Sequence, residues 1–320
     1  MRAQQSNADE VYHFLSLPYS AKATSLGGIN ISSIGSDLGL AMYNPALLDP
    51  SMDKTLHLSV KSYFSNIQQY DFSGAHYLPK RNWVLGWGIH YMGYGNITMT
   101  DASGNEMGNF LANDYVAQVS IASSFKQNII LGATLKLIQS NYGIYKSTGL
   151  AMDVSMAYTS SNNLLRASIL ANNVGLQVHS YTEKERLPLN IIMGVSKKLE
   201  NAPIQFSLTA QRLSIWNNSF YDPSFYNQEG YKPPSAAQDI FNHIIIGAEA
   251  NLAEQVSLDF GYNFIRRFDL NIQNQQNWFN GFSAGLGLKL PRVTIQYGNA
   301  FFQRNLYHHF SIFYSLKNTR

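Results

Sequence analysis

The residues of this chain that are best placed for chemistry are charged side chains within segments of alternating hydrophobicity. Asp71 and seven candidate lumen charges fall on the polar face of their segment, the seven being Lys61, Lys136, Asp153, Arg166, Glu249, Asp259 and Lys289. Such groups could line a path for a substrate, or they could form salt bridges that hold an internal segment in place. We favour the salt-bridged interior.

Catalytic and metal-binding motifs are otherwise missing from the sequence. With no cysteine, the chain has no thiol nucleophile, no thiolate metal site and no disulfide. It also has no nucleophile elbow, no helical histidine pair and no phosphate-binding loop. Asp101, Ser103, Asn105 and Glu106 match calcium ligands only loosely, which favours a polar hairpin tip. We therefore expect a protein that is not an enzyme and that holds no cofactor or metal.

Aromatic and cationic residues concentrate in two predicted loops, 214–240 and 266–280. Because Trp, Tyr and Arg are enriched at binding hot spots, these loops are candidates for contact with a partner. The candidate residues are Trp216, Tyr221, Phe225, Tyr226, Tyr231, Arg266, Arg267, Trp278 and Phe279. The same aromatic residues could instead pack loop against loop or belong to a membrane girdle. The two arginines could also contact the phosphates of lipopolysaccharide.

The composition leaves few classes of protein open. Only 13% of the residues are charged, against roughly 25% in an average soluble domain, whereas the chain has 20 Tyr and 18 Phe. This profile argues against a disordered chain or a coiled coil, and a net charge of +3 is too small for a nucleic-acid binder. No stretch reaches 18 consecutive apolar residues, which excludes helical membrane spans. The membrane class that remains is the β-barrel.

Residues 55–320 read as fourteen segments of about ten residues with period-two hydrophobicity. A tilted transmembrane strand needs about 9–11 residues. In the segment 256–264, every second residue from Val256 to Phe264 is apolar, and those between are polar or glycine. The segments are 55–64, 67–78, 82–94, 114–125, 129–140, 149–159, 163–172, 189–199, 203–213, 241–250, 255–265, 281–290, 292–300 and 308–316. We predict an all-β protein, a 14-stranded antiparallel transmembrane β-barrel.

The lengths of the connections between these segments support a bacterial outer-membrane barrel. The connections after even-numbered segments are all short, and all but one of those after odd-numbered segments are longer. Short periplasmic turns that alternate with long external loops are typical of such barrels. The first residues, 1–5, carry no export signal, so the chain is either cytosolic or a mature protein whose signal was removed.

The first 54 residues do not share the alternation. They contain several prolines and glycines among apolar residues, and a barrel of fourteen strands is too wide for its own side chains to fill. We therefore predict that residues 1–54 form a plug, or hatch, inside a barrel of residues 55–320; the alternative is a disordered leader. The glycine pairs Gly86/Gly88 and Gly285/Gly287 lie in predicted strands, where glycine usually relieves crowding at a bend.

Several motifs resemble the PorQ family of outer-membrane components of the type IX secretion system. They are Phe14-Leu15-Ser16-Leu17-Pro18, Ser20-Ala21-Lys22, Leu26-Gly27-Gly28, Tyr43-Asn44-Pro45-Ala46-Leu47-Leu48, Gly104–Phe110, Ser140-Asn141-Tyr142-Gly143 and Gly194-Val195-Ser196-Lys197. The resemblance runs from about residue 11 to residue 212. The plug motif Asn44-Pro45-Ala46 also resembles the wider FadL-like group of fourteen-stranded barrels with an N-terminal hatch.

The resemblance to the PorQ family implies a non-enzymatic role in a Bacteroidetes-type bacterium. Such barrels belong to an attachment complex with a sortase-like protease, a shuttle barrel and a soluble partner, PorZ. The complex processes secreted cargo and joins it to lipopolysaccharide, and the barrel would anchor PorZ at the outer face. The alternative is a FadL-like transporter of small hydrophobic molecules. A transporter needs a continuous apolar pocket near the hatch, whereas an anchor can be plugged solid.

Overall fold

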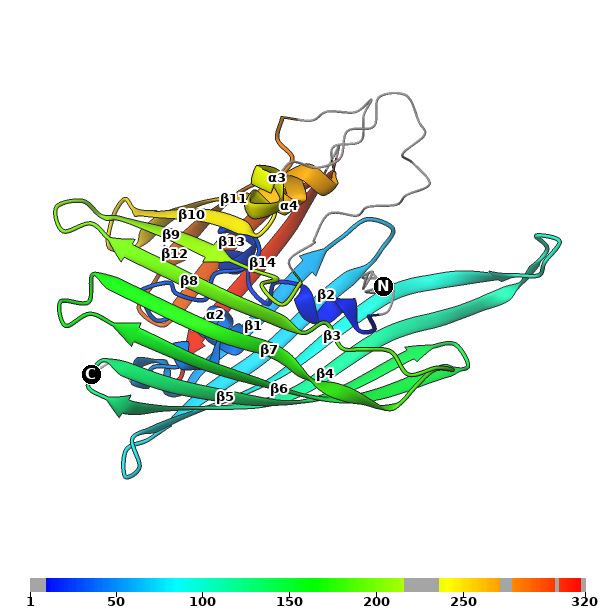
Figure 1. The fold of residues 1–320 in the computed structure, drawn as a ribbon, viewed down its shortest axis with the longest axis horizontal. Coiled ribbons are helices and arrows are strands. Elements are labelled where there is room, and N and C mark those ends of the chain that lie inside the picture. Colours follow the sequence, from blue (N-terminus) through cyan, green and yellow to red (C-terminus); the bar gives the residue numbers. More distant parts are fainter. Residues whose placement is uncertain (1–9, 216–235, 271–277, 303–304, 318–320) are drawn as a thin grey trace.

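The computed structural model describes residues 10–215, 236–270, 278–302 and 305–317. Within these ranges, fourteen antiparallel strands form one closed barrel, in which each strand pairs with its sequence neighbours and β14 pairs with β1 (Figure 1). The predicted all-β, fourteen-stranded barrel is therefore confirmed. The strands are β1 (Thr55–Ser62), β2 (Gln68–Leu78), β3 (Trp83–Thr100), β4 (Glu106–Lys126), β5 (Ile129–Tyr142), β6 (Tyr145–Thr159), β7 (Leu165–His179), β8 (Asn190–Lys198), β9 (Ile204–Ala210), β10 (Ile244–Asn251), β11 (Val256–Asn263), β12 (Phe282–Lys289), β13 (Val293–Phe302) and β14 (Asn305–Ser315).

The two faces of each strand meet different surroundings. On β5, Leu135 and Leu137 are 66% and 52% exposed on the outer face, whereas Lys136 between them is 2% exposed on the inner face. Apolar side chains that face outward and polar ones that face inward are what a membrane barrel requires, because lipid surrounds the wall. The alternation in the sequence therefore determines which face of the wall points to the lumen.

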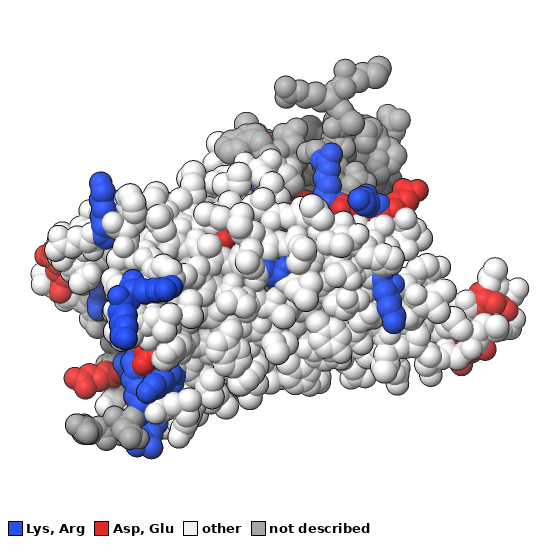
Figure 2. Space-filling view, turned by 90° about the horizontal axis from the view of Figure 1, so that it is seen from below, with Lys and Arg blue, Asp and Glu red and all other residues white. Residues whose placement is uncertain are grey.

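The connections differ in length between the two ends of the barrel. We call the end formed by residues 79–82, 127–128, 160–164, 199–203, 252–255 and 290–292 the short-turn end. The opposite, long-loop end carries the short helices α3 (Ala236–Phe241) and α4 (Phe264–Asp269) (Figure 1). Lys and Arg side chains gather at the short-turn end, together with a smaller number of acidic side chains, and both signs of charge also occur at the long-loop end (Figure 2).

Two of the predicted loops are extensions of hairpins. The prediction placed residues 95–113 and 141–148 in loops, but β3 and β4 continue to a turn at 101–105, and β5 and β6 to a turn at 143–144. The backbone hydrogen bonds between β3 and β4 continue beyond the residues in which apolar and polar side chains alternate, and the register of the pairing shifts between Gly93 and Asn96. Gly143 closes the β5–β6 hairpin with a φ of 61°, a conformation that glycine adopts readily.

Residues 10–54, which we call the N-terminal segment, lie inside the barrel (Figure 1). The segment contains the short helices η2 (His13–Ser16), α1 (Ala21–Ser25), α2 (Leu38–Tyr43), η3 (Pro45–Leu47) and η4 (Pro50–Met52). The helices α1, α2, η3 and η4 are each preceded by a Ser, Asp or Asn residue at the N-cap. The side chain of that residue accepts a hydrogen bond from a backbone N–H of the first turn, which would otherwise have no partner.

The hydrophobic core of the protein is built largely by this segment. Leu15, Ile31, Leu38, Leu40 and Met42 are almost fully buried and pack against inward-facing residues of the wall. The apolar side chains of the wall itself point mainly outward, so the lumen depends on the N-terminal segment for its apolar filling. No helix in the described ranges combines the length and the apolar character of a membrane-crossing helix.

Candidate functional site

Glycines on the inner face of the wall contact the backbone of the N-terminal segment. A Cβ atom on Gly132 would lie 2.3 Å from Ala46 N, and one on Gly261 would lie 2.2 Å from Gly27 N. Since Cβ atoms essentially never approach so closely, only glycine allows the two backbones to touch. Close approaches below 3 Å to the same segment also occur at Gly149, Gly194, Gly285 and Gly298.

The motif 44–46 is hydrogen-bonded to the wall on two strands. The buried Asn44 donates from Nδ2 to Ile31 O at 2.6 Å and to Ser168 Oγ on β7 at 2.9 Å. Its Oδ1 accepts a hydrogen bond from Ala46 N at 3.1 Å, and the same N–H lies 2.9 Å from Ser155 Oγ on β6. The turn is therefore held by polar contacts as well as by packing.

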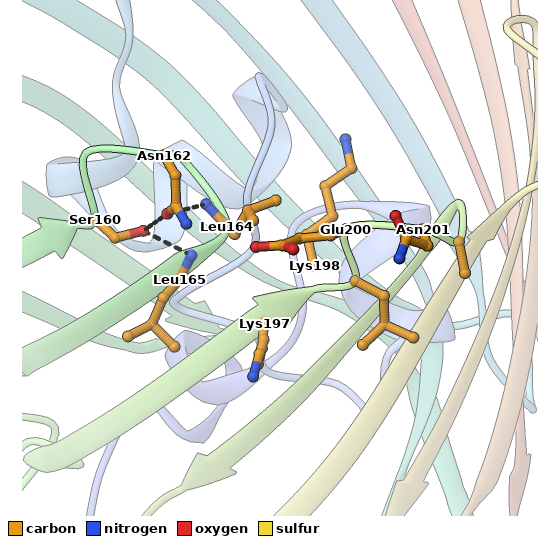
Figure 3. A pocket seen from close by; sticks show the side chains of 10 residues that line it. Ser160, Asn162, Leu164, Leu165, Lys197, Lys198, Glu200 and Asn201 are labelled. Carbon is orange, nitrogen blue, oxygen red and sulfur yellow. Dashed lines mark hydrogen bonds between the residues drawn. The ribbon is translucent and has the colours of Figure 1, made fainter.

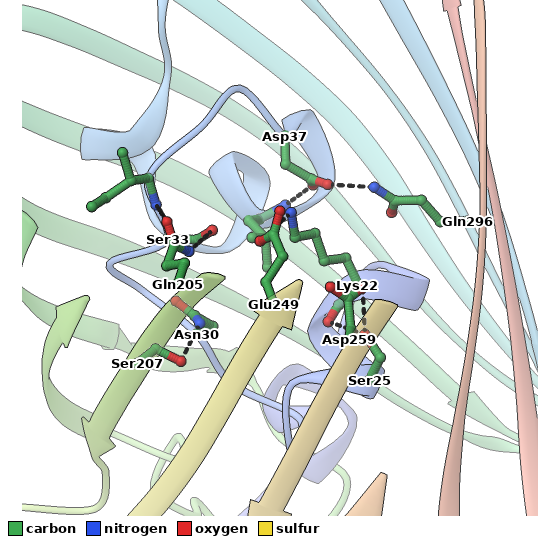
Figure 4. Close-up of polar contacts among 12 residues, drawn as sticks. Lys22, Ser25, Asn30, Ser33, Asp37, Gln205, Ser207, Glu249, Asp259 and Gln296 are labelled. Carbon is green, nitrogen blue, oxygen red and sulfur yellow. Dashed lines mark hydrogen bonds and ion pairs between the residues drawn. The ribbon is translucent and has the colours of Figure 1, made fainter. Parts of the chain in front are cut away.

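Ionic and hydrogen-bonded contacts join α1 to β10 and β11 (Figure 4). Lys22 Nζ lies 2.8 Å from Glu249 Oε2, and both side chains are about nine-tenths buried. Ser25 Oγ donates to Asp259 Oδ2 at 3.1 Å. Two of the predicted lumen charges, Glu249 and Asp259, thus contact the N-terminal segment. Lys22 itself was not among the predicted charges, because it lies outside the alternating segments.

A second ion pair lies within the wall. Lys136 Nζ on β5 is 2.7 Å from Asp153 Oδ2 on β6, and both side chains are 0% exposed. The same ammonium donates to Asn172 Oδ1 at 3.0 Å and to Asn173 Oδ1 at 2.9 Å. A register shift between β6 and β7 places both asparagines opposite the aspartate. The bulge therefore supplies the polar partners that a buried ammonium needs.

The remaining predicted lumen charges have separate positions. Lys61 is buried, with Nζ 4.8 Å from the centre of the Tyr63 ring. Arg166 is half-buried, and its Nη1 donates to Ser33 O of the N-terminal segment at 2.8 Å. Lys289 is exposed at the last position of β12, on the same face of the strand as the buried Ser283 and Gly287, so it lies at the short-turn rim and not within the lumen.

A cavity of about 800 Å³ lies at the long-loop end, between the N-terminal segment and the wall. Its apolar lining includes Leu17, Pro18, Ile29, Ile265 and Phe302.

The lining of this cavity also includes three cationic residues, Lys61, Arg212 and Arg266. Arg266 Nη2 donates to Gly27 O at 3.1 Å, and the guanidinium carbon lies 4.6 Å from the centre of the Phe302 ring. Neither Lys61 nor Arg266 has a carboxylate within 4.0 Å among the described residues. The cavity therefore combines apolar walls with two cations that no described carboxylate neutralises, and Glu10 is the one acidic residue among the described residues of its lining.

The predicted partner-binding residues divide into three groups. Arg266 points inward to the cavity and the N-terminal segment, and Arg267 lies in the same helix, α4. Trp278 and Phe279 are 81% and 59% exposed at the long-loop end. Residues Trp216, Tyr221, Phe225, Tyr226 and Tyr231 lie outside the described residues.

The loosely calcium-like residues form a hairpin turn. The Asp101 carboxylate accepts hydrogen bonds from Ser103 N at 2.8 Å and from both Asn105 N and Asn105 Nδ2 at 2.9 Å. These hydrogen bonds, first of all the one from the Asn105 side chain, lower the pKa of the Asp101 carboxyl. Within the described ranges, no group of three or more His, Asp or Glu side chains is arranged to hold a metal ion.

Comparison with known proteins identifies the fold. No protein-family model and no curated protein matches the chain. Among solved structures, the CymD monoaromatic hydrocarbon channel superposes with a TM-score of 0.58 at 12% identity, over 97% of this chain and all of that one. The Pseudomonas putida toluene transporter TodX gives 0.54 at 13% identity, over 93% of this chain and 96% of that one. A Pseudomonas aeruginosa FadL homologue gives 0.53 at 8% identity, over 93% and 98%.

The chain therefore has the barrel fold of FadL-type outer-membrane proteins of Gram-negative bacteria. These structural neighbours are channels and transporters rather than enzymes. The comparisons do not support the finer resemblance to the PorQ family.

Proposed function

We propose that this barrel binds and takes up small hydrophobic molecules at the outer membrane. The observation that carries the proposal is the cavity of about 800 Å³, which lies directly against the N-terminal segment at the long-loop end. Sites for small ligands occupy about 300–1,000 Å³ and are mostly apolar, with a few polar groups that orient the ligand. The fold likeness to a monoaromatic hydrocarbon channel and a toluene transporter supports the same class of ligand.

The charges in the cavity refine this ligand class. Lys61 and Arg266 each lie over an aromatic ring, Tyr63 and Phe302 respectively, and have no carboxylate partner among the described residues. An acidic group on the ligand would neutralise both cations, while an alkyl or aromatic body would contact the apolar lining. We therefore expect a small amphipathic acid to bind more tightly than a neutral hydrocarbon of the same size.

The test is titration calorimetry of the barrel in lipid nanodiscs with dodecanoate and with toluene. Ile265→Trp fills the cavity, because Ile265 is buried in its lining, and should weaken dodecanoate binding at least tenfold. Ile240→Trp adds the same ring to an exposed position outside the cavity and should leave binding unchanged. If neither probe binds the parent barrel, or if Ile265→Trp binds as the parent does, the uptake proposal is wrong.

A second candidate function is the anchoring of PorZ in a type IX attachment complex, as the resemblance to the PorQ family implies. The specific observation in its favour is the seating of the N-terminal segment, whose backbone touches the wall at Gly132 and Gly261. An anchor needs no opening through the barrel, so a tightly packed lumen suits it. Its partners would be PorZ, the sortase-like protease and the shuttle barrel, with lipopolysaccharide at the outer face.

The anchor is tested by a mild-detergent pull-down of the tagged barrel from its native outer membrane, followed by mass spectrometry. Stoichiometric PorZ supports anchoring, whereas a barrel that elutes alone with small amphipathic ligands supports uptake. Trp278→Ala with Phe279→Ala should release PorZ, since both side chains are exposed at the long-loop end. Met107→Ala, an exposed residue on the β3–β4 hairpin, serves as the matched control.

A further inference from the structure

We propose that the short-turn end carries a binding site for an anionic phospholipid, between the β6–β7 and β8–β9 turns. A cavity of about 740 Å³ lies there, separate from the cavity at the long-loop end (Figure 3). Its lining combines the apolar Leu164, Leu165 and Leu199 with Lys197 and Lys198. Because short turns face the periplasm in bacterial outer-membrane barrels, this site would meet the inner leaflet, which is made of phospholipid.

The position of Lys197 places a cation on the outer surface of the wall. Lys197 is the second-last residue of β8 and pairs with Leu165 on β7 and with Phe206 on β9. All three side chains are exposed on the outer face, so the ammonium lies between two apolar side chains at the edge of the apolar band. A lysine at such an edge extends its charged end towards the lipid headgroups.

The cations at this cavity are not neutralised by the protein. Among the described residues, neither Lys197 nor Lys198 has a carboxylate within 4.0 Å. The acidic residue in the lining is Glu200, and it is exposed. An anion from outside the chain is therefore the natural partner of the Lys197 ammonium group.

The whole short-turn end has the same excess of positive charge (Figure 2). Among the described residues at and next to the short turns, nine are cationic and four acidic: Lys54, Lys80, Arg81, Lys126, Lys197, Lys198, Lys289, Arg292 and Lys317, against Asp49, Asp53, Glu200 and Glu254. A surface with this excess attracts anionic lipid headgroups, by about fivefold in affinity for each cation near the membrane surface.

Aromatic rings beside two of these cations mark the depth of the headgroups. The guanidinium carbon of Arg81 lies 5.0 Å from the Trp83 ring centre, and Lys126 Nζ lies 5.9 Å from that of Phe125. Tryptophan belts mark the membrane–water interface, so the cations lie at the level of lipid phosphates. A lipid therefore explains both halves of the cavity, since its phosphate meets Lys197 on the outer face and its acyl chains meet the leucines. Lys198, which extends in the opposite direction, adds to the positive charge of the surface (Figure 3). A soluble acidic protein would explain only the charge.

The test is native mass spectrometry of the detergent-solubilised barrel, titrated with phosphatidylglycerol or with zwitterionic phosphatidylcholine. We expect retention of phosphatidylglycerol, and about 25-fold weaker retention by Lys197→Gln with Lys198→Gln, because two cations are lost. The matched control is Lys146→Gln with Lys184→Gln, two exposed lysines at the long-loop end, which should bind as the parent does. Glycerol 1-phosphate should not compete, because it lacks the acyl chains.

Heat-modifiable migration on SDS gels verifies that each variant is folded before the titration. Equal retention of the two lipids, or unchanged retention in the Lys197/Lys198 variant, would overturn the proposal. Competition by glycerol 1-phosphate would show that the cavity binds phosphate rather than lipid, which also overturns it. The inference is independent of what the barrel transports or anchors.

Discussion

Replacement of Gly132 by alanine tests whether the N-terminal segment is seated against the wall. The added Cβ would lie 2.3 Å from Ala46 N and 2.4 Å from the carbonyl carbon of Pro45. Ordinary contact begins at 3.4 Å, so the turn must retreat by about 1 Å. That movement weakens the hydrogen bond between Ala46 N and Ser155 Oγ, which is now 2.9 Å long. Overpacking costs about 1–3 kcal/mol and a lost hydrogen bond about 1 kcal/mol, so we expect a loss of about 2–4 kcal/mol in unfolding free energy.

The matched control for this substitution is Gly287→Ala on β12. There the added Cβ meets Ser257 Oγ at 2.4 Å, and the next atom lies at 3.7 Å. A serine hydroxyl can rotate away, so we expect a change below about 1 kcal/mol, including the gain from a less flexible unfolded chain.

The assay for both substitutions is reversible urea unfolding in lipid vesicles, followed by tryptophan fluorescence. A single cysteine at Ala41 adds a local readout, because the chain has no cysteine of its own and Ala41 is fully buried in α2. Gly132→Ala should speed the labelling of that cysteine, and Gly287→Ala should not. Equal stability and equal labelling in the two variants would refute the reasoning, because a turn that yields freely is not seated against Gly132.

Three further perturbations address the polar contacts. Two are measured by the same unfolding assay, and the one at Lys22 by the labelling of a single cysteine introduced into α1. Lys136→Met leaves a fully buried Asp153 carboxylate without its cation and should cost about 3–5 kcal/mol, whereas adding Asp153→Asn should recover more than half of that loss. Lys22→Met should speed cysteine labelling in α1, and adding Glu249→Gln should slow it again, because the unpaired carboxylate is then removed. Asn44→Ala removes two donated hydrogen bonds and should cost about 2 kcal/mol; a change below about 0.5 kcal/mol would show that Asn44 only fills space.

The barrel could be predicted from the sequence because lipid and lumen impose opposite polarity on successive residues. Leu135, Lys136 and Leu137 illustrate the rule, and it locates all fourteen strands. The rule fails where both faces of a strand meet water, so the alternation predicts a loop at residues 106–113, which belong to β4. There, only backbone hydrogen bonds between β3 and β4 extend the hairpin, and such bonds do not require any pattern of side-chain polarity.

The contacts of the N-terminal segment could not be predicted in the same way. Gly285 was interpreted as relief of crowding at a bend, but its missing side chain makes room for Ser25, whose Cβ lies 2.5 Å from the place of a Gly285 Cβ. This contact joins residues 260 positions apart in the chain (285 against 25), and a single sequence carries no signal for such a contact. Likewise, the sequence predicts Arg266 in an external loop that contacts a partner, whereas its side chain donates to Gly27 O inside the barrel. An arginine at this position indicates a binding role, but only the fold determines which group the guanidinium contacts.

The seating of the N-terminal segment limits how any ligand could pass. Expulsion of the segment would break the ion pair between Lys22 and Glu249 and the hydrogen bonds of Asn44. It would also break the hydrogen bond between Thr24 Oγ1 and His309 Nδ1, which is 2.8 Å long. At about 1 kcal/mol or more for each contact, together with the burial of the apolar core, the expelled state costs more than about 5.5 kcal/mol. Its population is then below about one in 10⁴. Uptake must therefore proceed by local movement beside the cavity, around Pro18 and Ile29, while the turn at Asn44 stays in place. Anchoring requires no movement of the N-terminal segment. A segment that never moves would therefore favour anchoring over uptake.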